Sequence, residues 1–530
     1  MTTAYQIKQG GEVAIIGAGG GVDIWRAHLA QSKKITAVEI NSGIIELMRG
    51  ALRKFSSDVY FLKEVEIEYQ EGRHYIGHSN KQFDIIQVSF VDTFTPTGTE
   101  SSTMSESGLY TVQAFREYWQ HLKPDGILTF TRWGGKKRGM GEIERASVLA
   151  VDMLLKHGVK EPWKHTVILR NPIRKDALMS RGYLSLPRAH EMAVMVVKKS
   201  PFTAAELATI KESVALYKQR PLYIPEEKVG PPQFAKFVHA TTLAELKEIA
   251  EARYQKLYFD LDPPTDDRPY FFSMLRPFDF FSMAEKFPKW NETSPRKDKY
   301  IGIKLLLIVV LILFVLSLLF IVGPLFLRPR KAGQTALSLP LLLYFSLLGL
   351  GFILIEISVI NQFTYLLGHP IYSLAVSLFS MLVFTGIGSL IFSKLKLKHS
   401  FFIPLLITVV AFLAWLGYPV LIEAFMQQEI FLSVVVVVLC LAPLSVMMGM
   451  GLPLGVSLLS DSLSETIPWA FALNGVFSVT GSTLAIVFSM QEGFKFTFFT
   501  GVVCYAVATV SVIAFGLLRR VHSGERFIQR

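Results

Sequence analysis

The sequence has only two cysteines, Cys440 and Cys504, and both fall within apolar runs. This excludes a disulfide framework, and it excludes a thiolate metal site in the first 300 residues. Charge is also scarce in part of the chain. Residues 301–518 hold long uncharged runs, whereas residues 1–300 hold most of the charge. With 51% hydrophobic residues, the chain is too apolar for an ordinary soluble enzyme.

The charged half lacks a basic stripe with interleaved aromatic residues, which would indicate a nucleic-acid surface. The net charge of +11 reflects basic residues beside apolar segments, where they set membrane topology and meet anionic headgroups. These flanking residues are Arg328, Arg330, Lys331, Lys394, Lys396, Lys398, Arg519 and Arg520. We therefore expect no nucleic acid among the partners. The first nine residues are polar, so we expect no cleavable signal peptide either.

Uncharged runs long enough to cross a bilayer, which takes about 20 apolar residues, recur after residue 300. The predicted spans are 303–327, 338–360, 371–393, 401–422, 430–456, 467–489 and 495–517. They predict an all-α polytopic membrane domain of about seven helices over residues 301–518, followed by a basic tail at 519–530.

Three polar residues of this domain need an explanation. Glu356 lies deep in an apolar run, where an acid costs about 2.5–3.5 kcal/mol and marks either a functional site or an internal pair. His369, between Gly368 and Pro370, is expected at an interfacial turn. Asn474 is expected to join two helices by a hydrogen bond.

Residues 1–200 alternate short apolar runs with helical stretches, as a buried parallel sheet requires. The predicted strands are Val13–Gly17, Ile35–Ile40, Val65–Tyr69, Asp84–Val88, Gly126–Thr131, Thr166–Leu169 and Met192–Val197. Seven strands with a late pair are typical of the class I methyltransferase fold, a Rossmann-like α/β domain. Residues 201–300 are expected to form a mixed α extension and linker, with helices near Thr203–Lys218 and Thr242–Gln255.

A glycine-rich stretch, Gly17 to Asp23, follows the first predicted strand. Glycine lets the backbone approach a ligand closely, and the helix that follows offers free N–H donors. Gly17, Gly19, Gly21 and Asp23 are therefore candidate nucleoside-binding residues. The pattern departs from the dinucleotide fingerprint, which has a glycine where Val22 stands.

Two carboxylates follow the second and third predicted strands. Glu39 stands twenty residues beyond Gly19, where a carboxylate can accept hydrogen bonds from both ribose hydroxyls. Glu71 and Gly72 follow the third strand, where this fold class places groups near the adenine. The alternative is that both acids are solvated loop residues, but ligands of open α/β sheets bind at this edge.

The fourth predicted strand leads to Ser89 and Asp92, which are the candidate catalytic residues. Asp92 could act as a base or bind an amine. A helix cap or a loop acid is the alternative interpretation of Asp92.

Together these motifs resemble those of the spermidine-synthase-like polytopic membrane proteins of bacteria. The stretches that carry the resemblance are Gly17–Asp23, Val38–Ile40, Glu71–Arg73, Asp84–Thr93, Leu109–Val112, Leu122–Gly126, Pro263–Phe272 and Gly368–Pro370. The resemblance implies a nucleoside ligand: S-adenosylmethionine, its decarboxylated form or methylthioadenosine. It implies no metal.

The departures from soluble spermidine synthases bear on the chemistry. Those enzymes have an aspartate inside the first glycine motif, where Gly20 stands here, and one at the end of the fourth strand, where Ser89 stands. Only Asp92 matches the second acid of that loop. The N-terminal β-domain of the soluble enzymes has no counterpart before Val13. A serine needs an activating base before it can take part in proton transfer.

Three functions fit the sequence. The first is a membrane-bound, aminopropyltransferase- or methyltransferase-like transferase with S-adenosylmethionine or decarboxylated S-adenosylmethionine as cosubstrate. Its partners would be membrane lipid and a small-molecule acceptor, either a polyamine or a lipid-soluble molecule, and a homodimer is a possible assembly. The second is a transporter or channel regulated by a nucleoside, and the third is a non-catalytic nucleoside-binding membrane protein.

The expected location is a bacterial inner membrane, with several spans and the charged domain in the cytoplasm. Two arguments conflict about the side of the membrane on which the charged domain lies. The basic residues that flank the spans favour an external charged domain. The lack of an export signal and the cytoplasmic supply of adenosyl cosubstrates favour the cytoplasm, which is our prediction.

Overall fold

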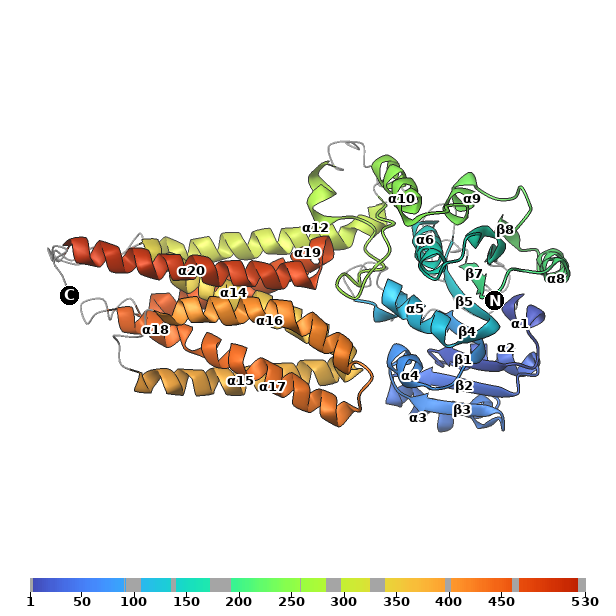
Figure 1. The fold of residues 1–530 in the computed structure, drawn as a ribbon, viewed down its shortest axis with the longest axis horizontal. Helices are drawn as coiled ribbons and strands as arrows, with labels where there is room; N and C mark the ends of the chain where they lie inside the picture. The colour runs from blue at the N-terminus through green and yellow to red at the C-terminus, as the bar shows by residue number, and fades with distance from the viewer. Residues whose placement is uncertain are drawn as a thin grey trace. The chain divides into compact units, whose positions relative to one another are not determined.

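The computed structural model describes residues 3–89, 91, 106–134, 140–171, 192–257, 259–282, 297–324, 339–395, 402–459 and 467–522. The chain divides into two compact units, Met1–Ile303 and Lys304–Arg530. Figure 1 shows a sheet with helices on both of its faces in the first unit, and helices alone in the second.

The first unit, the sheet unit, is built on an eight-stranded sheet with the order β3-β2-β1-β4-β5-β7-β6-β8 among the described residues. Its strands are β1 (Glu12–Ile16), β2 (Lys34–Glu39), β3 (Val65–Tyr69), β4 (Phe83–Ser89), β5 (Leu122–Trp133), β6 (Thr166–Asn171), β7 (Met192–Lys198) and β8 (Arg220–Tyr223). The first five strands pair in parallel, and β7 lies antiparallel between β5 and β6.

This order confirms the class I methyltransferase-like fold, and each predicted strand is present within a few residues. The predicted count of seven strands is wrong. An eighth strand, β8, pairs antiparallel with β6 at the edge of the sheet. It was missed because it has four residues, one of them Pro221, and a proline argues against any strand except an edge strand.

Successive residues of the central strands enter two different cores, as the period of two requires. Ala14, Ile16 and Val88 face one core, whereas Val13 and Ile15 face the other. Both faces of the sheet are therefore covered, which explains why the strands are continuous apolar runs rather than alternating ones.

The helices of the sheet unit follow the strands. They are α1 (Thr3–Ile7), α2 (Val22–Leu29), α3 (Ser42–Arg49), α4 (Gly72–His78), α5 (Val112–Gln120), α6 (Met140–Lys156), α8 (Ala204–Leu216), α9 (Pro232–Val238) and α10 (Leu243–Leu257), with the short 3₁₀ helices η1 (Val59–Phe61), η3 (Gly108–Tyr110), η4 (Pro162–Lys164) and η5 (Pro277–Asp279). Side-chain caps set several of their starts. Thr203 and Glu206 form a capping box on α8, and Thr111 caps α5.

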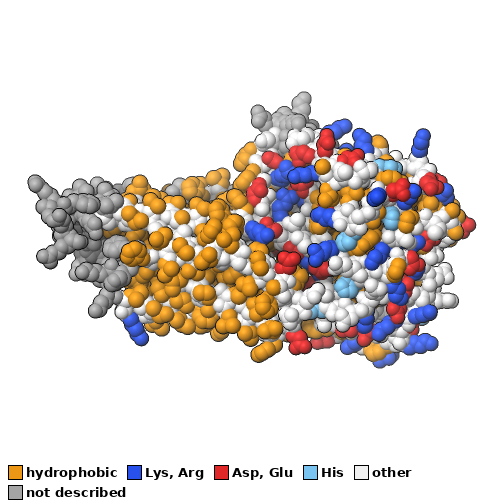
Figure 2. Space-filling model, in the orientation of Figure 1, with side chains coloured by type: hydrophobic (Ala, Val, Ile, Leu, Met, Phe, Trp, Pro, Cys, Tyr) orange, Lys and Arg blue, Asp and Glu red, His pale blue; other side chains and the backbone are white. Residues whose placement is uncertain are grey.

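Among its described residues, the second unit, the helical unit, contains helices and no strands. They are α12 (Lys297–Ser317), η6 (Leu318–Val322), α14 (Leu339–Leu367), α15 (Pro370–Lys394), α16 (Ile403–Phe425), α17 (Ile430–Gly449), α18 (Gly451–Leu458), α19 (Ile467–Glu492) and α20 (Phe494–His522). Among the described residues, seven stretches are long and apolar enough to cross a membrane, which is the number predicted. Figure 2 shows that the visible face of these helices is almost entirely hydrophobic.

The helix α14 lies at the centre of the helical unit. Its span is 61% buried, the largest share of the seven, and it packs against α15, α16, α17, α18, α19 and α20. Asn474 of α19 donates a hydrogen bond to the carbonyl of Phe345 on α14 (3.3 Å), which confirms its predicted role between helices. His369 accepts from the N–H of Ile371 and caps α15, as a turn residue should.

Candidate active site

The glycine-rich loop runs from the end of β1 into α2. Gly17, Gly19 and Gly21 have φ angles of +81°, +49° and +78°, a region that side chains with a Cβ rarely adopt. The N–H groups of Gly17 and Ala18 both donate to the carbonyl of Val38 (2.9 and 3.0 Å), so the loop crosses over the end of β2. The loop therefore holds its shape through its own backbone.

Close packing also requires glycine in this loop. A Cβ on Gly17 would stand 2.6 Å from Val91, and one on Gly21 would stand 2.5 Å from Val59. Gly20 has open space around its Cα.

Asp23, a predicted ligand residue, lies in the first turn of α2 and is buried in an ion pair with Arg26.

Glu39 ends β2 directly beneath this loop. Its carboxylate accepts hydrogen bonds from the N–H of Gly19 (2.9 Å) and the N–H of Asn41 (3.0 Å), and the residue is 6% exposed. Glu39 is therefore held in one orientation against the glycine loop. Each carboxylate oxygen has a second lone pair, so both oxygens can still accept from a ligand hydroxyl.

Tyr60 of η1 supports the same loop from outside, and no local pattern of residues marks it as a site residue. Its hydroxyl donates to the carbonyl of Gly19 (2.8 Å). Burial and the nearby Glu39 carboxylate raise the pKa of the phenol, so it stays a donor at neutral pH. Tyr60, Gly19 and Glu39 thus form one connected group at the ends of β1 and β2.

Glu71 and Gly72 lie just beyond β3. The Glu71 carboxylate accepts from the N–H of His74 (2.8 Å) and caps α4, so part of its role is structural. Burial raises the pKa of Glu71, against the opposing N–H groups of His74 and Arg73. A Cβ on Gly72 would collide with the side chain of Ile16, so only glycine lets α4 begin this close to β1.

The predicted catalytic residues fall at the end of β4. Ser89 accepts a hydrogen bond from the side-chain amide of Gln87 (3.0 Å), and Gln87 in turn accepts from the hydroxyl of Tyr5. An amide cannot take a proton from a serine, so Ser89 has no activating base among the described residues. Asp92 lies outside the described residues.

Arg73 joins the Glu71–Arg73 motif to a distant loop. It pairs with both oxygens of Glu117 (2.7 and 3.0 Å) and both oxygens of Asp266 (2.7 and 2.8 Å). Thr111 also donates to Asp266 (2.7 Å). Sequence reasoning missed this group because Asp266 lies 193 residues from Arg73 along the chain.

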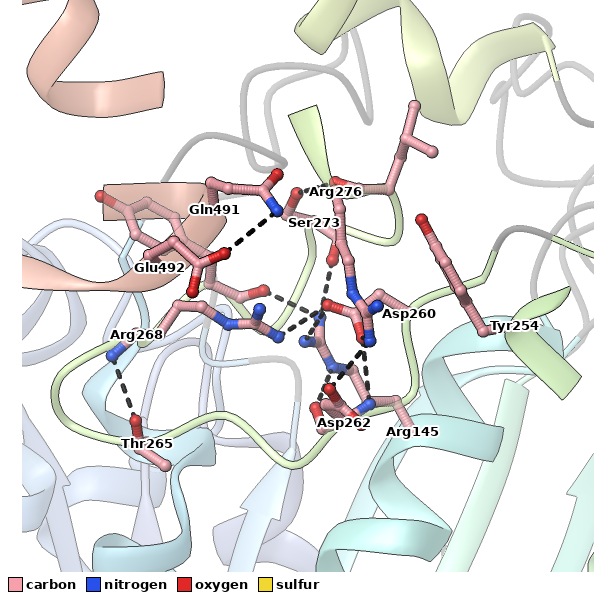
Figure 3. Close-up of polar contacts among 12 residues, drawn as sticks. Arg145, Tyr254, Asp260, Asp262, Thr265, Arg268, Ser273, Arg276, Gln491 and Glu492 are labelled. Carbon is pink, nitrogen blue, oxygen red and sulfur yellow. Dashed lines mark hydrogen bonds and ion pairs between the residues drawn. The ribbon is translucent and has the colours of Figure 1, made fainter. Parts of the chain in front are cut away.

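A second arginine fixes the same loop, residues 259–276. Arg145 of α6 is 1% exposed and donates to the carbonyls of Tyr270, Phe271 and Ser273 (2.9, 2.9 and 2.7 Å). Figure 3 shows its guanidinium beside Asp260, with Arg268 and Arg276 on that same carboxylate. Burial opposes ionisation of Asp260, but the three arginines together lower its pKa.

A buried cation lies at the end of β5, at the same edge of the sheet as the glycine loop. Arg132 is fully buried, and its guanidinium carbon lies 4.0 Å from the ring centre of Tyr110. Phe272 and Phe271 stand at 5.1 and 5.6 Å. The loop 259–276 thus supplies two of the three rings, which explains why it must be fixed in place.

The polar groups at this edge suit a neutral sugar and base. Glu39 offers acceptors to a ribose, and the glycine loop allows close backbone approach. No group of three or more His, Cys, Asp or Glu side chains that could hold a metal ion occurs among the residues described.

Residues 3–136 match the family model described as the spermine/spermidine synthase domain. A polyamine aminopropyltransferase of Clostridium botulinum (strain Eklund 17B / Type B) is 29% identical over 129 residues, which are 24% of this chain and 41% of that protein. A second, from strain Alaska E43 / Type E3, matches to the same extent. The chain therefore matches less than half the length of these curated relatives. The match confirms the resemblance inferred from the motifs of the first 136 residues.

Among solved structures, spermidine synthase from Thermotoga maritima is 18% identical with a TM-score of 0.29, covering 47% of this chain and 72% of that chain. An rRNA methylase from Streptococcus thermophilus is 12% identical with a TM-score of 0.23, covering 37% of this chain and 93% of that chain. The fold is established by the strand order of the sheet.

Proposed function

We propose that this protein is a multi-pass membrane transferase whose sheet unit binds S-adenosylmethionine or decarboxylated S-adenosylmethionine at the ends of β1, β2 and β3. The observation that carries the proposal is the buried Glu39 carboxylate, oriented by the N–H groups of Gly19 and Asn41. A carboxylate fixed beside a glycine loop at this edge is the ribose-binding arrangement of open α/β sheets.

The adenine end of the ligand would lie at Glu71 and Gly72. Glu71 accepts from the N–H of His74, and the remaining lone pairs of its carboxylate are available to the base. The catalytic match to the polyamine aminopropyltransferases is weaker, because Gly20 and Ser89 replace two acids that would hold and deprotonate an amine. We therefore infer a poor spermidine synthase whose acceptor is another small or lipid-soluble molecule, with Asp92 as the candidate base.

The binding test is isothermal titration calorimetry on the full chain in detergent, with S-adenosylmethionine, its decarboxylated form and methylthioadenosine. Hydrogen bonds to a charged group contribute about 1.5–3 kcal/mol, so Glu39→Ala should weaken binding more than tenfold. Glu46→Ala, an exposed acid on α3, is the matched control and should bind like the parent. Unchanged affinity in Glu39→Ala would remove Glu39 from the site.

The reaction itself is tested by its product. Aminopropyl transfer releases methylthioadenosine, and methyl transfer releases S-adenosylhomocysteine. Turnover of putrescine with the decarboxylated cosubstrate at ordinary enzyme rates would contradict our inference about Ser89. Release of neither product with any acceptor, despite binding, would leave the non-catalytic alternative.

The sheet unit is proposed to face the cytoplasm of a bacterial cell, because the adenosyl cosubstrates are made there. A cysteine at Ser79, the half-buried residue directly after α4, can be probed in intact spheroplasts with a membrane-impermeant maleimide. The described sheet unit has no cysteine of its own. Labelling without lysis would place the unit outside the cell.

A further inference from the structure

The middle of α14 carries one buried acid that the proposed transferase does not use. Glu356 lies 17 residues after Leu339 and 11 before Leu367, and it is 8% exposed. At a rise of 1.5 Å per residue the nearer helix end is about 16 Å away, so Glu356 lies near the middle of a hydrocarbon core about 30 Å thick.

Glu356 has no hydrogen bond or ion pair with any residue that the structure describes. Its neighbours along α14, Ile355 and Val359, belong to the apolar core of the helical unit. Leaving a carboxylate ionised and unpaired at this depth is costly, so this setting favours the neutral acid. An acid retained at such a cost without a structural contact indicates a site.

Unsatisfied hydroxyl groups provide a second, independent observation on two helices that pack against α14. Four buried hydroxyl oxygens have no hydrogen-bond partner among the described residues: Ser377 and Thr385 on α15, and Ser433 and Ser445 on α17. The residues Ser377, Ser433 and Ser445 are each 0% exposed. Buried hydroxyls left unpaired by protein are the groups that ordered water satisfies.

The register of the helices brings one of these hydroxyls, that of Ser377, to the level of Glu356. The helices α14 and α15 are consecutive spans joined at Gly368–His369, so they run in opposite directions. Ser373 donates to the carbonyl of Ile360 across that interface. One turn back along α14 from Ile360 is Glu356, and one turn forward along α15 from Ser373 is Ser377.

Other charged residues on the helices around α14 lie near helix ends. They are Lys394, Glu423, Glu492, Lys495, Arg519, Arg520 and His522. The remaining titratable residues on α14 and these helices are tyrosines and cysteines: Tyr344, Tyr365, Tyr372, Tyr418, Cys440, Cys504 and Tyr505. Tyr505 of α20, which is 2% exposed, interacts electrostatically with Glu356. None of these groups supplies a cation at the level of Glu356.

We propose that Glu356 is a proton-binding site of the helical unit, reached through a hydrated path that includes the unpaired hydroxyl of Ser377 on α15. The ligand is a proton because a single carboxyl among apolar side chains, a phenol and hydroxyls lacks the several oxygen ligands that a metal cation requires. Chains of protonatable and hydroxyl groups within spans are typical of proton relays. The site makes the helical unit a proton-exchanging domain in its own right, independent of the proposed transferase.

The test uses dicyclohexylcarbodiimide, a lipid-soluble reagent. The O–H of a protonated carboxyl adds across one of its C=N bonds, and the O-acylisourea that forms rearranges to a stable N-acylurea. The full chain in nanodiscs is treated at neutral pH, and peptides are analysed by mass spectrometry. We expect labelling at Glu356 at least tenfold above that at Glu423, an exposed acid near the end of α16. Glu356→Gln should remove the label, and Glu356→Asp should keep it.

Folding of each variant is checked by size-exclusion chromatography, and Glu423→Gln is the matched control that should retain the label. The path is tested by the rate of labelling, which should rise as the pH is lowered, because more of Glu356 is then protonated. The variant Ser377→Leu, which fills the path, should reduce this rise in labelling rate several-fold. Absence of label on the folded parent protein would overturn the proposal. Protection by Na⁺ at constant pH would also overturn it, because the site would then bind a metal cation.

Discussion

The two units hold their most deeply buried ionisable groups in contrasting settings. In the sheet unit, Arg73 and Arg145 are almost inaccessible, yet each is surrounded by carboxylates or carbonyls from loops far away in sequence. In the helical unit, Glu356 is buried to a similar degree with no hydrogen-bonding or ion-pairing partner among the described residues. A buried charge that is fully paired is a structural contact, whereas a buried acid without a partner has no structural reason to persist.

Packing differs between the units for a related reason. The layers of the sheet unit meet through large apolar side chains, each of which contributes about 1.5–3 kcal/mol when removed from water. Lipid is as apolar as those side chains, so helices in a membrane gain instead from close backbone contact. A Cβ on Gly388 would collide with the carbonyl of Val446, and one on Gly449 would collide with the carbonyl of Thr385.

The largest effect is expected from breaking a pair in the sheet unit. Arg145→Met would leave Asp260 with fewer partners and would remove a donor from four loop carbonyls, those of Asp262, Tyr270, Phe271 and Ser273. Removing one partner of a buried ion pair costs about 3–5 kcal/mol. Pulse proteolysis in urea, which follows the sheet unit within the full chain, should show that loss.

Arg49→Met is the control for this substitution, because Arg49 is exposed on α3. It should change stability by no more than about 0.5 kcal/mol. Equal stability of the Arg145 and Arg49 variants would mean that the loop 259–276 is held by its apolar residues alone. The contrast between the two units would then fail.

A smaller effect is expected from the glycine contacts of the helical unit. Gly388→Ala forces α15 away from α17, and overpacking of this kind costs about 1–3 kcal/mol. Gly386→Ala, two residues away on the same helix, meets nothing within 4 Å and is the matched control. Thermal stability in detergent, measured by size-exclusion chromatography after heating, should fall for Gly388→Ala alone. Equal loss in both variants would indicate a general intolerance of α15 rather than a specific contact.

Much of the fold could be predicted from sequence because its signals are local. Seven strands were mostly apolar runs of four to six residues, and each span was an apolar run of bilayer length with at most one charged residue. The glycine loop and Glu39 were predictable because their place relative to β1 and β2 is fixed by short stretches of chain. The strand β8 was not, because a short segment containing Pro221 becomes a strand only when β6 provides an edge.

The contacts that fix the site were outside the reach of sequence reasoning. Tyr60 reaches Gly19 across 41 residues, and Arg73 reaches Asp266 across 193. Nothing local marks such partners, because an arginine that forms a buried pair reads like any surface arginine. Similarly, the role of Glu71 as a helix cap depends on where α4 begins, and Gly72 gives no clear starting signal.

The smallest effect concerns a titratable group of the sheet unit that, like Glu356, is incompletely paired. His74 stacks on His78 with ring centres 3.9 Å apart, and its Nδ1 is buried without a hydrogen-bond partner among the described residues. Burial, together with His78, lowers the pKa of His74 from 6.5 to about 4. Between these pH values the unfolded chain binds more protons than the folded one, so stability falls as pH drops from 6.5 toward 4. Glu71 acts in the opposite direction, because its raised pKa adds stability at low pH.

His74→Gln should therefore recover about 1 kcal/mol of the stability lost on acidification, a figure reduced because the ring is partly exposed. Urea midpoints measured by pulse proteolysis at neutral and acid pH test this, with the exposed His239→Gln as control. If both variants follow the parent profile, the pKa of His74 is the same in the folded and the unfolded chain, and the burial of its ring does not make the sheet unit sensitive to acid.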